Sequence, residues 1–305
     1  MSTKNLSSLL PILSCLIAAT LWGLLWYPMR LLEAQGIPGL WGSLLIYIAA
    51  LLPLLPRVFV HLEGLSRQPG LLFMLALTAG WANLGFILAV LEGTIVRVLL
   101  LFYLSPIWSV LLGWVVLKER PSPAALFSIV LALTGAFVIL WLPDEPNPWN
   151  IDRADVLAIT AGFAFSVMNI CIRKLGDIPM ILKLIPAFLG VILLSGIGAL
   201  VLQPVPPEFN AVSLMLVLAT GSIGMLVMTY TAQYGVTHLP VHRSAVLFLF
   251  EIVAGAVSAI LLTDEITTIR EWLGGGMVIV ATWITAHEAM NDRRSRISQS
   301  KSIVT

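Results

Sequence analysis

RSAVLFLFEIVAGAVSAILLTDE, from Arg243 to Glu265, is the stretch of this chain that decides its fold. Between Ser244 and Leu262 about 19 residues carry one ionisable side chain, Glu251, and a helix needs about 20 apolar residues to cross a bilayer. The sequence therefore predicts a membrane-spanning helix. A carboxylate near the middle of such a span costs roughly 2.5–3.5 kcal/mol on insertion scales, so such residues usually face a polar interior and mark a pathway or a binding site.

An earlier stretch, RVLLLFYLSPIWSVLLGWVVLKE, repeats this pattern. Aligned end to end, the two stretches are identical at Arg97 and Arg243, Leu101 and Leu247, Phe102 and Phe248, and Glu119 and Glu265. A similar alignment lays Trp22, Gly23, Trp26 and Arg30 on Phe165, Ser166, Asn169 and Arg173. Residues four apart share one face of a helix, so these sets form matching faces. The chain is therefore predicted to be duplicated.

The composition is that of an integral membrane protein. The 305 residues are 59% hydrophobic and 11% charged, whereas a soluble domain has about 45–50% apolar and about 25% charged residues. The net charge of +1 and the lack of a basic stripe argue against a nucleic-acid partner. Cys15 and Cys171 lie in apolar runs and lack the spacing of a disulfide framework or a metal site.

Apolar runs bounded by Pro, Gly and charges predict about ten helices. The predicted divisions are a first repeat at 1–143, a linker at 144–155, a second repeat at 156–290 and a cytoplasmic tail at 291–305. The expected helices are Leu9–Leu32, Ile37–Leu55, Gly70–Leu91, Ile95–Leu117, Pro123–Leu142, Val156–Leu175, Ile178–Leu202, Ala211–Val236, Val241–Leu262 and Trp272–Ala289.

The positions of Lys and Arg predict the orientation, because these residues are retained in cytoplasmic loops. With the N-terminus in the cytoplasm, every Lys and Arg falls on the cytoplasmic side except Arg30, Arg97, Arg153 and Arg270. Both termini are therefore expected in the cytoplasm. Because each half has five helices, the halves enter the membrane in opposite senses. This inverted repeat is common in transporters, whose substrate binds near the midplane between the halves.

Candidate binding residues are the polar and aromatic side chains at mid-span depth. Glu251 could bind a proton or a substrate ammonium group, or it could make a hydrogen bond between helices. Trp22 and Trp26 could line a cavity or belong to an interfacial belt. The other candidates, each of which could equally hold helices together, are Asn83, Tyr103, Phe165, Asn169, Tyr230 and Phe248.

Charged residues at the helix ends have a structural and a functional interpretation. Glu119 and Glu265, at opposite faces of the membrane, could form salt bridges or gate contacts. Arg30 and Arg173 are expected to reach the lipid headgroups. Small residues four apart, such as Gly162 and Ser166, would let helices approach closely, and the glycine run that begins at Gly274 is expected to do the same.

Enzyme and metal motifs are absent from the sequence. HEAMN, from His287, lacks the second His of a zinc protease, and His238 and His242 have no third ligand nearby in the sequence. No Gly-x-Ser-x-Gly turn or phosphate loop occurs. No catalytic activity, metal or cofactor is therefore expected.

The quoted segments resemble the duplicated EamA domains of the drug/metabolite transporter superfamily. The resemblance rests on YLSPIWSVLLGWVVLKERPS (Tyr103–Ser122), LFEIVAGAVSAILLTDEITT (Leu249–Thr268) and AATLWGLLWYPMRL (Ala18–Leu31). In that family the fourth helix of each half typically carries a proline near its middle and ends in Gly-Glu. Pro106 and Glu119 match in the first half and Glu251 and Glu265 in the second, whereas Lys118, Ile252 and Asp264 depart from the pattern.

The resemblance implies an all-α protein of about ten transmembrane helices that transports small metabolites across the inner (plasma) membrane, often as an exporter. Phosphate cargo would want Lys or Arg at cavity depth, and only Lys183 is noticeably inset, so amino acids are the first expectation. Efflux of cationic or lipophilic drugs remains open, as does a non-transporting membrane scaffold or sensor. The expected partners are a small-molecule substrate, the lipid bilayer and, as an open option, protons. The chain is expected to be a monomer or a weak oligomer.

Overall fold

The computed structural model describes residues 3–58, 68–140, 151–176, 178–202, 205–262 and 268–302. Within these residues every regular element is a helix. The first repeat contains α1 (Thr3–Leu24), α2 (Trp26–Ala34), α3 (Gly39–Leu51), η1 (Leu52–Leu54), α4 (Leu55–Val58), α6 (Pro69–Glu92), α7 (Ile95–Phe102), α8 (Ser105–Leu117) and α9 (Pro123–Leu140). The second contains α10 (Arg153–Lys174), α11 (Met180–Leu202), α12 (Ala211–Leu218), η2 (Ala219–Met225), α13 (Leu226–His238), α14 (Val241–Phe248), α15 (Phe250–Leu262) and α16 (Ile269–Ser302).

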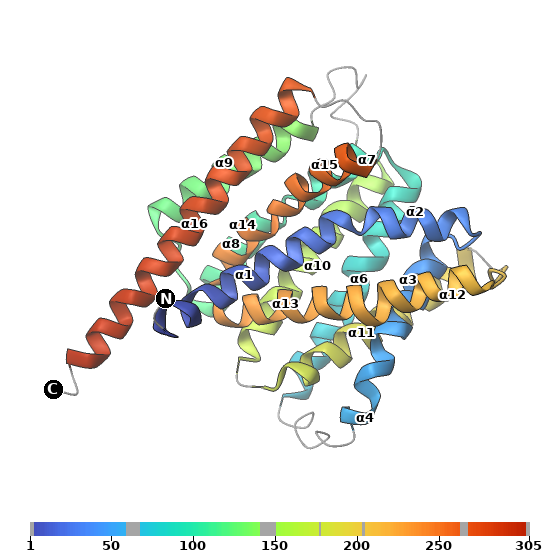
Figure 1. Cartoon of the computed structure of the whole chain (residues 1–305), viewed down its shortest axis with the longest axis horizontal. Coiled ribbons are helices and arrows are strands. Elements are labelled where there is room, and N and C mark those ends of the chain that lie inside the picture. The colour runs from blue at the N-terminus through green and yellow to red at the C-terminus, as the bar shows by residue number, and fades with distance from the viewer. Residues whose placement is uncertain are drawn as a thin grey trace.

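The hydrophobic helices confirm the predicted ten-helix membrane protein. By length and composition, 8 helical segments of the described residues can cross a membrane. A shorter apolar helix, Gly39–Leu54, and α16 complete the two sets of five. Helix α16 continues past its predicted end at Ala289 to Ser302. It begins at the end of the bundle opposite the start of α1 and finishes at the end where α1 begins, as an even number of spans requires (Figure 1).

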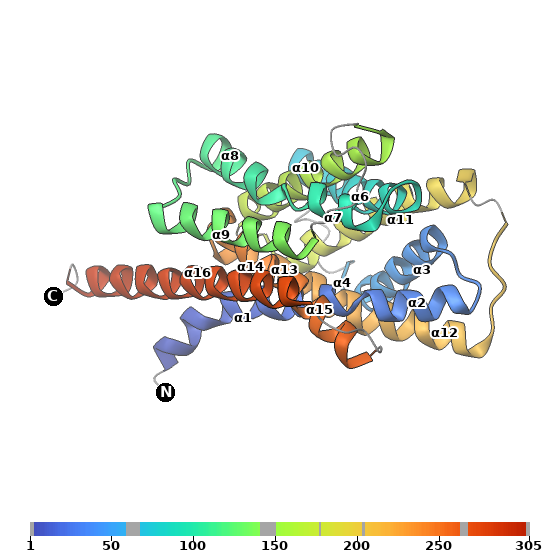
Figure 2. The same cartoon turned by 90° about the horizontal axis from the view of Figure 1, so that it is seen from above.

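The packing of the helices repeats the duplication. Helix α10, the first of its repeat, packs on α6, α7 and α8, and α1, the first of the other repeat, packs on the corresponding α13, α14 and α15. Two further contacts join equivalent helices of the two repeats, α3 with α11 and α9 with α16 (Figure 2). The largest fully buried side chains include Phe188, Leu184 and Met228, where α11 meets α3 and α13.

Glycines allow the closest approaches between helices. A Cβ atom on Gly190 of α11 would overlap the backbone of Ala76 in α6. A Cβ on Gly23 of α1 would lie 2.5 Å from the carbonyl oxygen of Glu251, and one on Gly162 would lie 2.6 Å from that of Phe102. The close packing expected at Gly162 is therefore confirmed, and Gly23 shows the same kind of contact. Because glycine has no side chain, helices can bring their backbones together at these positions, and such close packing favours helix association inside a membrane.

Candidate functional site

The fourth helix of the first repeat is interrupted near its middle. Helix α7 ends at Phe102, and α8 begins at Ser105 after the turn residues Tyr103 and Leu104. Pro106 lies in the first turn of α8, where its missing N–H group leaves no helical bond unmade. At Leu104 the backbone N–H bonds to a carbonyl three residues back. This break places two consecutive side chains, Phe102 and Tyr103, in the interior of the bundle.

The fourth helix of the second repeat is interrupted at the matching position. Helix α14 ends at Phe248 and α15 begins at Phe250, with Leu249 alone between them. Ile252 stands where the first repeat has proline, and its N–H donates to the carbonyl of Leu249 at 3.1 Å. The break therefore does not depend on proline, although it is one residue shorter than its counterpart. Broken helices near the midplane form the binding sites of many inverted-repeat transporters.

Four rings meet between the two breaks. We call Trp22 of α1, Phe102 of α7, Phe165 of α10 and Phe248 of α14 the ring cluster. The ring centroids of Phe165 lie 5.7 Å from Phe102, 6.1 Å from Phe248 and 6.1 Å from Trp22. Trp22 and Phe248 are 5.6 Å apart with nearly perpendicular planes. Each ring comes from the first helix or the broken fourth helix of a repeat, so the cluster joins the two repeats.

A carboxyl group lies beside the ring cluster. The carboxyl of Glu251, in the first turn of α15, is hydrogen-bonded to the side chain of Tyr103, which is 8% exposed. The bond joins the two broken helices, one from each repeat. Because a phenol donates only one hydrogen, the carboxyl keeps acceptor capacity for a second partner. The arrangement can hold a proton or a positively charged group among apolar surroundings.

Two further predicted residues lie on the helices around this carboxyl. Trp26, at the start of α2, donates from Nε1 to Oγ of Ser258 in α15 at 2.9 Å. Asn169 of α10 is 3% exposed and stands one helical turn beyond Phe165. No hydrogen bond of its amide is found among the described residues. Trp26 is therefore occupied by a structural bond, whereas Asn169 retains its bonding capacity.

Asn83 bonds to neighbouring helices, and Tyr230 lies on an outer face of the bundle. Oδ1 of Asn83 accepts from Ser43 at 2.7 Å and from Ser195 at 3.1 Å, which ties α6 to α3 and α11. Tyr230 is 45% exposed on α13, on the same outer face as Val227. Asn83 thus holds helices together, and Tyr230 faces outward.

Phe102 is a member of the ring cluster that was not among the predicted binding residues. It bridges Phe165 and Phe86, whose ring centroid lies 5.0 Å from its own. The signal was available, because the repeat alignment pairs Phe102 with the candidate Phe248.

One end of the bundle, which we call the Lys183 end, is closed by a polar network. After a left-handed turn at Lys118, Glu119 accepts from Nε of Arg173 at 2.8 Å and from the backbone N–H of Val241 at 2.9 Å. The carboxylate therefore joins the ends of α8 and α10 to the start of α14. The expectation that Arg173 reaches lipid headgroups is wrong, because its guanidinium group bonds to the carboxylate of Glu119. This partner lies at a helix end that is distant in sequence.

Lys183 lies at the same end and is completely buried. Its ammonium group donates to the carbonyl oxygen of Gly176 at 3.1 Å and to Oγ1 of Thr237 at 3.0 Å. Arg173 donates to the backbone oxygen of the same threonine. Thr237 thus links the two cations, and both are bound to protein acceptors.

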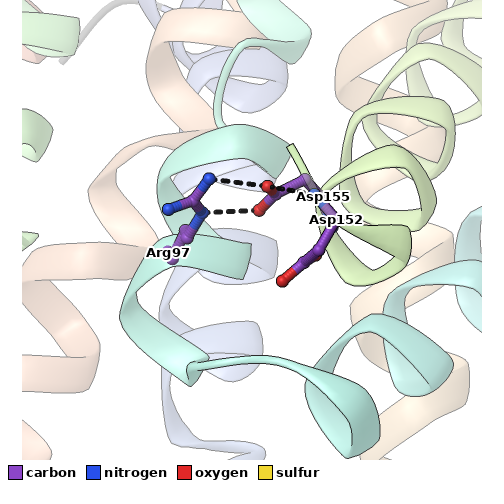
Figure 3. A network of polar contacts seen from close by, with 3 residues as sticks. All are labelled: Arg97, Asp152 and Asp155. Carbon is purple, nitrogen blue, oxygen red and sulfur yellow. Dashed lines mark hydrogen bonds and ion pairs between the residues drawn. The ribbon is translucent and has the colours of Figure 1, made fainter. Parts of the chain in front are cut away.

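The opposite end carries a second ion pair. Arg97 of α7 makes a two-pronged bond to Asp155 of α10, with both N–O distances 2.6 Å (Figure 3). Asp155 also closes a capping box with Asp152 at the start of α10. Paired, parallel bonds of this kind fix geometry well. Glu265, the repeat counterpart of Glu119, lies outside the described residues.

The described residues contain no group of three or more His, Cys, Asp or Glu side chains that could hold a metal ion. The titratable group of the centre is the Glu251 carboxyl with its tyrosine partner. A carboxyl group of this kind is able to bind a cation or a proton reversibly.

Comparison with known proteins agrees with this geometry. The model of the EamA-like transporter family matches residues 9–141 and 152–286. A solved structure titled "Crystal structure of protein" superposes with a TM-score of 0.74 at 18% identity and covers 92% of this chain and 98% of its own. That likeness shows the fold. No curated protein matches the sequence.

Proposed function

Because the chain belongs to the EamA-like transporter family, we propose that it is a secondary transporter that exports small metabolites, first of all amino acids. It works in the inner (plasma) membrane as a monomer or weak oligomer, with both termini in the cytoplasm. The two repeats alternate access to a site between them. The observation that carries the proposal is the Glu251 carboxyl, hydrogen-bonded to Tyr103 beside the ring cluster.

The chemistry of the centre supports a zwitterionic substrate. The Glu251 carboxylate can bind an ammonium group, and the rings of Trp22 and Phe248 can add cation–π attraction. The unbonded amide of Asn169 and the broken start of α15 offer donors to a substrate carboxylate.

The cations support the exclusion of phosphate cargo. Arg97, Arg173 and Lys183 are bonded to protein oxygens at the two ends of the bundle. A phosphate at the centre would therefore lack a basic partner.

A second candidate is efflux of cationic or lipophilic drugs. The observation that favours it is the ring cluster, whose four apolar side chains outnumber the single acid beside it. Such a substrate needs Glu251 and the rings but no donor for a carboxylate.

The test is uptake of labelled amino acids into proteoliposomes, with and without a pH gradient. We expect wild type to move at least one amino acid and Glu251→Gln to lose most of that flux or its response to pH. The matched control is Glu92→Gln, the same change at an exposed helix end, which should transport normally. Transport of a cationic dye but of no amino acid would replace the first proposal with the second.

A further inference from the structure

Helix α16 carries a stripe of buried polar atoms with no hydrogen-bond partner. Thr282 and Thr285 are 7% and 1% exposed, and neither hydroxyl has a partner among the described residues. Glu288 follows three residues later, and its Oε2 is also buried without a partner. Residues three apart neighbour one another on a helix. We call Thr282, Thr285 and Glu288 the polar seam.

Other threonines in the spans behave differently. Thr20, Thr78, Thr134 and Thr231 each donate to the carbonyl four residues before them, at 2.7–2.8 Å. That bond satisfies a hydroxyl without any outside partner. The two seam threonines do not use it, although they lie in a regular helix. A buried hydroxyl without a bond costs about 1–3 kcal/mol, so their orientation calls for a partner such as ordered water.

The seam begins in the charged groups of the Lys183 end. Oε1 of Glu288 lies 3.4 Å from Nη2 of Arg243 and also accepts from the hydroxyl of Ser122. His242 is in electrostatic range of Glu288, Arg243, Glu119 and Arg173. Among the described residues, these charged groups connect this end of the seam to the polar network described above.

The seam ends near the depth of Glu251. Helix α14, continued by α15, packs against α16, and the two chain directions are opposite. The Arg243–Glu288 pair lies where α14 begins, so Glu251 follows Arg243 along one helix and Thr282 precedes Glu288 along the other. At a rise of about 1.5 Å per residue, Glu251 lies about 12 Å along the first path, and Thr282 lies about 9 Å along the second. Tyr103, which bonds to Glu251, shares one packed cluster with Ala281, the neighbour of Thr282.

We propose that the polar seam binds a file of water molecules that carries protons between the Lys183 end and the Tyr103–Glu251 pair. This inference rests on the proposed function and names its coupling route. Along the file each oxygen accepts one proton and releases another, so charge moves without movement of heavy atoms. The transferred proton ends on a carboxylate oxygen of Glu251. Buried waters need about three polar partners each, and the threonine hydroxyls and the free Glu288 oxygen supply them.

The first test asks whether the seam is wet, and it needs no substrate. Single cysteines at Thr282 and Thr285 are introduced in a Cys15→Ala, Cys171→Ala background and treated with a small water-soluble thiosulfonate reagent. We expect labelling at both positions at least tenfold faster than at Leu75→Cys, which is buried in a different apolar cluster on α6. Equal rates at all three positions would overturn the proposal.

The unfolding temperature of a Thr285→Val variant gives a second, independent test of whether the seam is hydrated. In a dry seam, Thr285→Val removes an unsatisfied hydroxyl and raises the unfolding temperature. In a hydrated seam the same change removes a water partner, so we expect the temperature to stay the same or fall. A clear rise would count against the water file.

The last test follows protons. Vesicles loaded with a pH-sensitive dye report substrate-driven proton movement, and exchange of labelled for unlabelled substrate reports transport without net coupling. We expect the Thr282→Val, Thr285→Val double variant to lose proton movement several-fold and keep exchange. The Thr282→Ser, Thr285→Ser variant should keep both, as should Thr134→Val. Wild-type proton movement in the valine variant would overturn the route. Absence of exchange in wild type would overturn the proposed function and the route with it.

Discussion

At the residue scale, the proposed site depends on one bond between an acid and a phenol. The Tyr103–Glu251 pair joins the two broken helices, and the ring centroid of Tyr103 lies 6.0 Å from that of Phe102 within a cluster of apolar side chains. A carboxylate in such surroundings is stabilised by each hydrogen bond it receives. Losing the phenol therefore weakens both the orientation and the charged form of the group.

Tyr103→Phe tests this bond. Hydrogen bonds to charged groups contribute about 1.5–3 kcal/mol, so we expect substrate affinity to fall about tenfold or more while the protein still folds. Affinity is read from concentration-dependent uptake. Tyr47→Phe is the matched control, because it removes a buried phenol that bonds to Asn83 and not to Glu251. It should lower thermal stability and leave affinity unchanged, and a reversed pattern would contradict our assignment.

Three members of the ring cluster were among the predicted candidates. Trp22 and Phe165 came from the repeat alignment and Phe248 from its mid-span depth, and the three rings meet in the structure. Arg173 and Tyr230 could not be placed in the same way. Their surroundings depend on which helix ends meet and which face of α13 turns outward, and these follow from tertiary packing, which one sequence does not contain.

At the scale of elements, the breaks in the fourth helices differ in how far they could be predicted. Pro106 marks the first break, since proline breaks helical bonding. The second break, at Leu249, has no residue type that announces it. Only its equivalence to Tyr103 in the repeat points to it. The proline predicts the first break from local sequence, whereas the second can be predicted only from its equivalence to the first in the repeat.

Close helix packing gives a prediction at this scale. Gly190→Ala places a methyl group on the backbone of Ala76, so we expect a loss of about 1–3 kcal/mol of stability. Gly275→Ala is the matched control, because nothing lies within 4 Å of a Cβ there, and alanine is the better helix former by about 1 kcal/mol. Thermal unfolding in detergent should therefore fall for the first variant and stay level or rise for the second. Equal effects would contradict the packing.

At the scale of the whole molecule, two repeats pack around the proposed site. The duplication, the ten helices and their class follow from hydrophobic runs and repeated segments, because membrane spans are long and strongly patterned. The contacts that close the ends do not follow in this way. The Glu119–Arg173 pair and the Arg97–Asp155 pair each join residues more than one helix apart, and both connect α10 to the fourth helix of the other repeat.

The most direct test of the central claim is counterflow with purified protein. Vesicles are loaded with unlabelled amino acid, and a trace of labelled amino acid is added outside with no pH gradient or membrane potential. We predict transient accumulation of label in wild type and none in Glu251→Ala, with Glu92→Gln equal to wild type. Label entry no faster than in protein-free vesicles, for amino acids and cationic dyes alike, would contradict the account and favour a non-transporting scaffold or sensor.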